Sequence, residues 1–337
     1  MATAHRPGTL RSMVCRHLPS LKGKRLLPFA DEFDNAGLHV REPFVVILLC
    51  GGPTGNLNDP IPKSLRDAFL KIIEFPALKN ADLIQAEEVT SQFDFFDHYT
   101  DILIFETDLA QIVELIILFC ESEGSVSELA AFAFIQEIYE RLFVIVREND
   151  WNQKSFIKLG PLRRIELKVG RDAIHVIADG DIGLRNRDAS AVDKNALRDL
   201  LDSPLQVRLS KPREPTTFDP SRPGHVIKLI VGLIQEYGAL TGPEIMGLLT
   251  RFDVHSSPES VRGYLLCAQA VRWIKSVSRG SHDYFVHTGR GEDAATFRMK
   301  EGAREKNKMR RRLAIREHWK SVDAARHSAI RVGAGRL

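Results

Sequence analysis

The stretch ELIILFCESEGSVSELAAF, residues 114–132, decides the predicted fold. Residues 115–119 form an unbroken apolar run, which is typical of a strand buried on both faces of a parallel α/β sheet. A polar turn over residues 121–125 follows, and residues 127–141 then show helical periodicity. A loop between such a strand and helix lies at the carboxyl edge of the sheet, where α/β folds bind their ligands.

Glu128 is the candidate catalytic residue of this stretch. We expect it in the first turn of the helix, where the helix dipole stabilises a carboxylate. A carboxylate at this edge can be directed at a bound sugar as a nucleophile. A purely structural alternative stays open, because acidic residues are enriched at helix N-termini for electrostatic reasons alone.

Strands and helices alternate on both sides of this stretch. Further strands are predicted over residues 44–50, 81–86 and 142–146. Helices are predicted between them over residues 64–73 and 97–113. This alternation with short connections indicates an α/β fold of three layers with a parallel sheet.

Three groups of polar or small residues follow these strands. The first strand leads into Gly51, Gly52 and Pro53, and such a turn lets backbone N–H groups approach a phosphate or ribose. Its structural alternative is a tight turn and nothing more. Arg66 lies near the start of the next helix. Glu106 and Asp108 come just ahead of the central strand.

Residues 151–224 give weaker signals. A loop over the site is expected at residues 155–162, and strands are expected at residues 165–169 and 173–178. Residues 205–224, which include Pro220 and Pro223, are predicted to be a linker.

Residues 225–289 predict a separate module. Three helices, over residues 225–237, 241–250 and 256–268, precede a hairpin, which is the order of a winged helix-turn-helix domain. Candidate contacts to nucleic acid are Arg262 and Tyr264 in the third helix and Arg279, Ser281 and His282 in the wing. A winged helix that binds protein remains the alternative.

Charge is unevenly distributed along the 337 residues. Residues 290–337 hold 14 Lys plus Arg and 6 Asp plus Glu, a net charge of +8, whereas residues 1–289 carry −5. The densest basic residues of this predicted helical tail are Lys306, Lys308, Arg310, Arg311, Arg312 and Arg316. The asymmetry favours a polyanionic partner, and a solvated helical tail is the alternative.

The composition is that of an ordinary globular protein, with 44% hydrophobic and 27% charged residues. No apolar run approaches the roughly 20 residues that span a bilayer. The four cysteines are far apart and include no CxxC pair, so we expect thiols in a reducing, cytoplasmic compartment and no metal site. Residues 1–43 are predicted to be an irregular, cytosolic N-terminal arm.

Three segments resemble, in order, the nucleoside deoxyribosyltransferase-like family: LCGGP at residues 49–53, Glu106 or Asp108, and GSVSELA at residues 124–130. Together with SFIKLGP at residues 155–161 and the C-terminal winged helix, they resemble the effector proteins of bacterial retron anti-phage systems. The resemblance covers roughly residues 40–290. One departure is Ala130, since the family often has glycine after Glu-Leu.

The resemblance implies a Rossmann-like catalytic domain over residues 44–204 that cleaves the N-glycosidic bond of NAD or a related nucleotide. Glu128 would be the nucleophile, and water would hydrolyse the glycosyl–enzyme intermediate. Glu106, or alternatively Asp108, would hold the ribose hydroxyls. The implied substrate-binding residues are Gly51, Gly52, Pro53, Arg66, Asp108 and Ser125.

The resemblance also implies a toxin that defends against phage. It would be restrained by a retron reverse transcriptase and its multicopy single-stranded DNA/RNA hybrid, and it would form an oligomer. NAD would be substrate rather than cofactor, and no cofactor is expected. The competing hypothesis is a non-enzymatic winged-helix DNA-binding regulator whose α/β domain senses a nucleotide.

Overall fold

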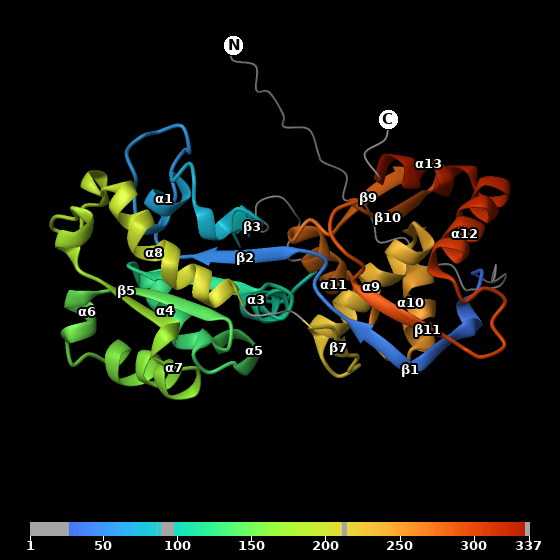
Figure 1. The fold of residues 1–337 in the computed structure, drawn as a ribbon, viewed down its shortest axis with the longest axis horizontal. Coiled ribbons are helices and arrows are strands. Elements are labelled where there is room, and N and C mark those ends of the chain that lie inside the picture. Colours follow the sequence, from blue (N-terminus) through green and yellow to red (C-terminus); the bar gives the residue numbers. More distant parts are fainter. Residues whose placement is uncertain (1–26, 86, 89–97, 211–213, 334–337) are drawn as a thin grey trace, which may run out of the picture.

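A computed structural model describes residues 27–85, 87–88, 98–210 and 214–333 (Figure 1). Its largest sheet has five parallel strands in the order β3-β2-β4-β5-β6. The strands are β2 (Val45–Cys50), β3 (Ala81–Ile84), β4 (Leu115–Cys120), β5 (Leu142–Arg147) and β6 (Ile174–Ile177). All six residues of β4 are buried. The predicted α/β fold with a parallel sheet is therefore confirmed.

Helices cover both faces of this sheet, because alternate strand residues point to opposite sides. Val46 and Leu48 of β2 belong to one hydrophobic cluster, and Ile47 and Leu49 to the other. The second cluster is covered by α1 (Leu65–Leu70) and α8 (Lys194–Leu209). The first is covered by α3 (Ile102–Ala110), α4 (Glu123–Phe132), α5 (Gln136–Tyr139) and α7 (Arg163–Lys168), and α6 (Glu148–Asn152) follows β5 (Figure 1).

The helix after β4 differs from the prediction. It begins at Glu123, because the Ser122 side chain accepts from the N–H of Ser125 while the Ser125 hydroxyl accepts from the N–H of Ser122. Gly124 is therefore helical, and Glu128 lies in the second turn. The expected single helix over residues 127–141 is instead the pair α4 and α5.

Other local predictions were also wrong. Residues 165–169, expected as a strand, lie mainly in α7, and residues 158–162 form a π-helical turn instead of a loop. The short apolar run around Ile165 packs a helix face as readily as a strand. The expected linker begins inside α8, which runs to Leu209. The expected strand near residues 173–178 is confirmed as β6. Residues 86, 97 and 211–213, included in predicted elements, lie outside the described residues.

The C-terminal half is built around α9 (Pro223–Tyr237), which is buried along almost its whole length. It is followed by β8 (Ala239–Leu240), α10 (Gly242–Arg251), α11 (Pro258–Ala270), β9 (Ile274–Arg279) and β10 (His282–His287). The three strands form an antiparallel sheet in the order β8-β10-β9. In Figure 1, α11 and α3 lie where this half meets the parallel sheet.

The predictions of an irregular N-terminal arm and of a helical C-terminal tail are both partly wrong. Residues 33–40 form β1 (Phe33–Val40), which pairs with β11 (Ala295–Met299) on one side and β7 (Thr216–Thr217) on the other (Figure 1). Residues 1–26 and 334–337 are not described. After β11, α12 (Lys308–Val322) packs on α9, and α13 (Ala324–Gly333) packs on β9 and β10. No helix in the described ranges is long and apolar enough to cross a membrane.

Candidate active site

An open pocket of about 680 Å³ lies at the carboxyl edge of the parallel sheet. Its walls come from the turn after β2 with Gly52, the segment after β4 with Glu121, and the end of β5 with Arg147. When the five strands are numbered by their order along the chain, they lie in the sheet as 2-1-3-4-5. This order reverses between β2 and β4. The pocket therefore occupies the switch point where doubly wound sheets bind ligands.

Beside this pocket lies a cluster that we call the carboxylate centre: Glu87, Glu106, Glu128 and Arg66. Glu106 is only 6% exposed, and burial, followed by the charges of Glu128 and Glu87, raises its pKa to about 8. Burial and Glu87 also raise the pKa of Glu128, while Arg66 lowers it. Among the described residues, those lining the pocket include Val126 and Ser127 of α4 but neither Glu128 nor Glu106.

Glu128 combines partial burial with an unused acceptor. Its Oε2 atom is buried and has no hydrogen-bond partner within the described ranges. An unsatisfied buried oxygen is costly, and such cost is tolerated mainly where a site needs the group. The helix dipole does not account for Glu128, because the residue lies in the second turn of α4.

Arg66 reaches the carboxylate centre from α1. Its Nη2 lies 2.9 Å from Glu87 Oε1, and its Nη1 lies 3.4 Å from the carbonyl oxygen of Leu49. Gly51, directly after β2, has a φ of 153°, and a Cβ on Gly51 would lie 3.1 Å from Arg66 Cβ. Gly51 is therefore required by local geometry.

Glu121 was missed as a site residue. Its Oε1 accepts from the N–H groups of Gly52 and Arg66, at 3.1 and 3.0 Å, and its Oε2 accepts from Leu65 N–H at 2.6 Å. The N–H of Gly52, predicted to meet the substrate, is thus already engaged. The usable sequence signal was an acid directly after a buried strand.

Ser125, predicted to bind the substrate, is not among the described residues that line the pocket. It is 1% exposed, and its hydroxyl accepts from the N–H groups of Glu121 and Ser122 while donating to the Ser122 carbonyl oxygen. These bonds fix the start of α4 and leave Ser125 a structural residue.

The two alternative acids of α3 face different neighbours. Glu106 is electrostatically coupled to Glu128, whereas Asp108 accepts a hydrogen bond from Tyr99 Oη at 3.0 Å. Tyr99 Oη also lies 3.1 Å from Cys267 Sγ on α11. Burial raises the pKa of Asp108 to about 6, although the bond from Tyr99 lowers it in part. The structure therefore brings Glu106, not Asp108, to Glu128.

Stability should depend on pH through Glu106. Its pKa rises from 4.5 to about 8 on folding, so between these values the folded chain holds a proton that the unfolded chain has released. Each pH unit in this window then costs up to about 1.4 kcal/mol of unfolding free energy. Relative to the parent, Glu106→Gln should therefore become progressively more stable from pH 5 to pH 8. Thermal unfolding at each pH measures this, and a pH-independent difference would refute it.

The predicted nucleic-acid or partner contacts are dispersed over the C-terminal half. Arg262 is half-exposed and pairs with Glu259 at 3.2 Å, and Arg279 donates to the Ser278 carbonyl oxygen at 2.9 Å. Tyr264 is partly buried in the core that joins α11 to the rest of the chain. Ser281 and His282, at the tip of the β9–β10 hairpin, are exposed.

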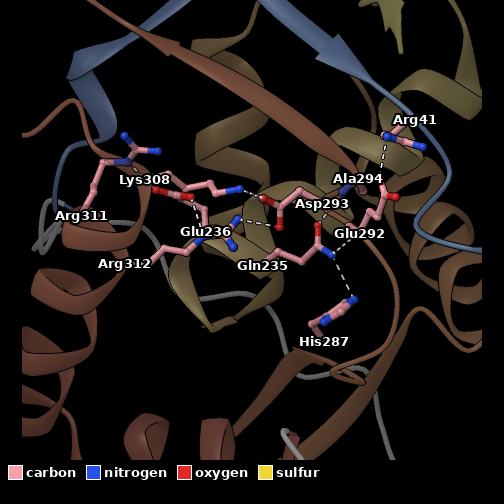
Figure 2. A network of polar contacts seen from close by, with 10 residues as sticks. All are labelled: Arg41, Gln235, Glu236, His287, Glu292, Asp293, Ala294, Lys308, Arg311 and Arg312. Atoms are coloured by element: carbon pink, nitrogen blue, oxygen red, sulfur yellow. Dashed lines mark hydrogen bonds and ion pairs between the residues drawn. The ribbon is translucent and has the colours of Figure 1, made fainter. Parts of the chain in front are cut away.

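Fewer basic side chains of the tail are available to contact a polyanion than its composition suggests. Lys306, Arg310 and Arg316 are exposed, but Arg311 is 2% exposed and its Nε pairs with Glu236 on α9. Arg312 pairs with Glu236 and Asp293, and Lys308 also pairs with Asp293 (Figure 2). Arg311 therefore serves the fold, and its predicted role as a surface contact is wrong.

Comparison with known proteins matches residues 62–276, more than half of the chain, to the family described as STM3845 retron effector protein. The "Retron Ec73 putative ribosyltransferase/DNA-binding protein" of Escherichia coli is 32% identical over 126 residues, 35% of this chain and 37% of that protein. Its counterpart from retron Ec86, also of E. coli, is 29% identical over 119 residues, 35% and 36% of the two chains. The match thus spans little more than a third of either relative. On the family match, this chain belongs to the retron effector proteins.

Proposed function

We propose that this chain is a retron effector enzyme that hydrolyses the N-glycosidic bond of NAD or a related nucleotide, with Glu128 as the nucleophile. The observation that carries the proposal is the buried Oε2 of Glu128, which has no hydrogen-bond partner among the described residues and belongs to the carboxylate centre beside the pocket. The word "ribosyltransferase" in the names of both relatives supports the same chemistry.

In the proposed reaction the Glu128 carboxylate attacks the anomeric carbon of the ribose. The bond to nicotinamide breaks, and its electron pair neutralises the pyridinium nitrogen, so this leaving group needs no proton. Water then hydrolyses the glycosyl ester, which returns Glu128 and releases one proton with ADP-ribose. The transition states resemble those of retaining glycoside hydrolysis.

The neighbouring residues would bind the sugar and favour the ionised form of Glu128. Glu106, with its pKa near 8, carries a proton at neutral pH and can donate a hydrogen bond to a ribose hydroxyl. Arg66 lowers the pKa of Glu128 and so favours the ionised nucleophile. Gly51, Gly52 and Pro53 provide a close wall after β2 for the sugar. The catalytic domain would thus be nucleoside deoxyribosyltransferase-like.

The deciding experiment incubates the purified full chain with NAD and follows free nicotinamide by chromatography. NADP and the nucleosides serve as alternative substrates in parallel reactions. Release of nicotinamide with matching ADP-ribose supports the proposal. Absence of cleavage of every nucleotide, together with retained nucleic-acid binding, would instead favour the non-enzymatic regulator.

We further propose that the C-terminal half is a winged helix that binds the retron hybrid or its reverse-transcriptase complex and restrains the enzyme. The order α9, β8, α10, α11, β9, β10 is that of a winged helix. The names of both relatives include DNA binding. Exposed Lys306 and Arg310 offer charge to phosphates.

Binding of the full chain to a branched RNA–DNA hybrid should weaken steeply with salt, because Lys and Arg release counterions from phosphates. Titrations at low and moderate salt, with and without the reverse transcriptase, measure this. The full chain is needed because β1 belongs to the same sheet as β11. Salt-insensitive binding to the reverse transcriptase alone would mean a protein-docking winged helix, and no binding to either partner would refute the proposal.

A further inference from the structure

Glu121 joins the turn after β2 to the start of α1, the helix that carries Arg66 of the carboxylate centre. It follows β4, and its carboxylate spans to the turn after β2 and to the start of α1. Both oxygens accept backbone N–H groups, three in all. Charge-assisted bonds of this kind are roughly twice as strong as neutral ones.

The sequence around these contacts fits the Glu121 carboxylate closely. A Cβ on Gly52 would lie 2.9 Å from Glu121 Oε1 and 2.8 Å from Ser64 Cβ, so a larger residue would push the turn away. The first N–H groups of a helix have no acceptor within the helix. In α1, Glu121 accepts from Leu65 and Arg66, while the Ser64 side chain accepts from Asp67 N–H at 2.9 Å.

Holding the backbone of Arg66 has a consequence at its side chain. The Arg66 side chain is 4% exposed, and its guanidinium extends to Glu87 Oε1 and to the Leu49 carbonyl oxygen. Its position thus depends on Glu121 at the backbone and on Glu87 and the Leu49 carbonyl oxygen at the guanidinium. A displacement of α1 would move the positive charge relative to Glu128.

We propose that Glu121 is a positioning residue of the carboxylate centre, which holds α1 so that the Arg66 guanidinium stays beside Glu128 and Glu87. Its effect on turnover rests on the proposed function, whereas its effect on the ionisation of Glu128 does not. Glu121 itself is not assigned any contact with the reacting atoms.

The test is Glu121→Gln, which keeps the shape but replaces one acceptor oxygen by an NH2 group. That group cannot accept from Leu65 N–H if the other two bonds are kept, so α1 loses one of its hydrogen bonds to residue 121. Among the described residues, the charged and titratable groups facing Glu128 are Arg66 from α1, Glu87 after β3, and Glu106 from α3, with the Cys50 thiol of β2 nearby. Since Arg66 is the cation of this set, its displacement should raise the pKa of Glu128.

The primary readout is NMR titration of carboxyl-13C-labelled glutamate, with the Glu128 signal assigned by its absence in Glu128→Gln. We expect a shift of about one pH unit, equivalent to a roughly tenfold lower ionised fraction on the acid side. In the active enzyme, the acid limb of the kcat/KM profile of Glu121→Gln should move about one pH unit higher than in the parent by the same cause. Glu121→Asp, with a shorter reach, serves the same test if the Gln variant does not fold.

Two further variants separate positioning from general damage. Arg66→Gln should raise the pKa of Glu128 in the same direction, and the double variant should match Arg66→Gln alone, because Glu121 acts through Arg66. Glu236→Gln, which disturbs a buried ion pair between α9 and α12, should leave the Glu128 titration unchanged. An unchanged Glu128 titration in Glu121→Gln, or additive shifts in the double variant, would overturn the inference. A parent chain that cleaves no nucleotide would defeat the proposed function and leave this titration result intact.

Discussion

Nucleotide cleavage should fall at least about a thousandfold when Glu128 is replaced by Gln. The amide cannot form the glycosyl ester, so the loss falls on the chemical step and appears in kcat. Burial raises the pKa of Glu128, which means that its charge is costly in the folded chain. A neutral Gln of the same shape should therefore leave the fold intact.

Initial rates of nicotinamide release, with thermal unfolding on the same samples, test this expectation. Glu137→Gln on α5 is the matched control, because it makes the same chemical change outside the carboxylate centre. Parental rates in Glu128→Gln would remove Glu128 from the mechanism. A loss of activity accompanied by loss of the folded state would leave the chemical role unsupported and would contradict the expected intact fold.

The largest expected effect on stability comes from Glu236→Ala in α9. Glu236 is 2% exposed; its Oε1 pairs with Arg311 and its Oε2 lies 2.9 Å from Arg312 Nε (Figure 2). Truncation leaves the buried Arg311 guanidinium without its carboxylate, which costs about 3–5 kcal/mol in comparable buried pairs. Arg312 keeps Asp293, at 3.0 Å, as a second partner.

Urea or thermal unfolding followed by circular dichroism measures the change in the free energy of unfolding. Glu317→Ala is a suitable control, because Glu317 is exposed on α12. The control should change stability by less than about 0.5 kcal/mol. A loss below about 1 kcal/mol in Glu236→Ala would show that α12 does not depend on this ion pair for its place on α9.

The sequence predicted the structure best where a local pattern is compatible with one kind of element. The apolar runs of β2, β4 and β5 were correctly predicted as buried strands of a parallel sheet. Glu106, given as the first of two alternatives with Asp108, interacts electrostatically with Glu128, and its role in holding the ribose stays a prediction. The strand predictions succeeded because strands buried on both faces need continuous apolar residues, and the sheet edge follows from their order.

The failures come from partners distant in sequence or from short reciprocal caps. The exchange between Ser122 and Ser125 moved the start of α4 by four residues relative to the prediction. Arg311 could not be distinguished from the exposed Arg310 beside it, because its partner Glu236 is 75 residues away. Local charge counting records cations but not the buried acids that neutralise them.

The pairing of β1 with β11 makes the five-stranded sheet an insertion within the C-terminal half. The chain enters that half through β1, leaves it to build the parallel strands, and returns through β7. Val40 pairs with Ala295, so this contact closes a very long loop. During synthesis the parallel sheet can form before β11 has been made, and β1 then lacks this partner strand. A chain truncated before β11 would leave an open β1 edge, which can pair with other chains.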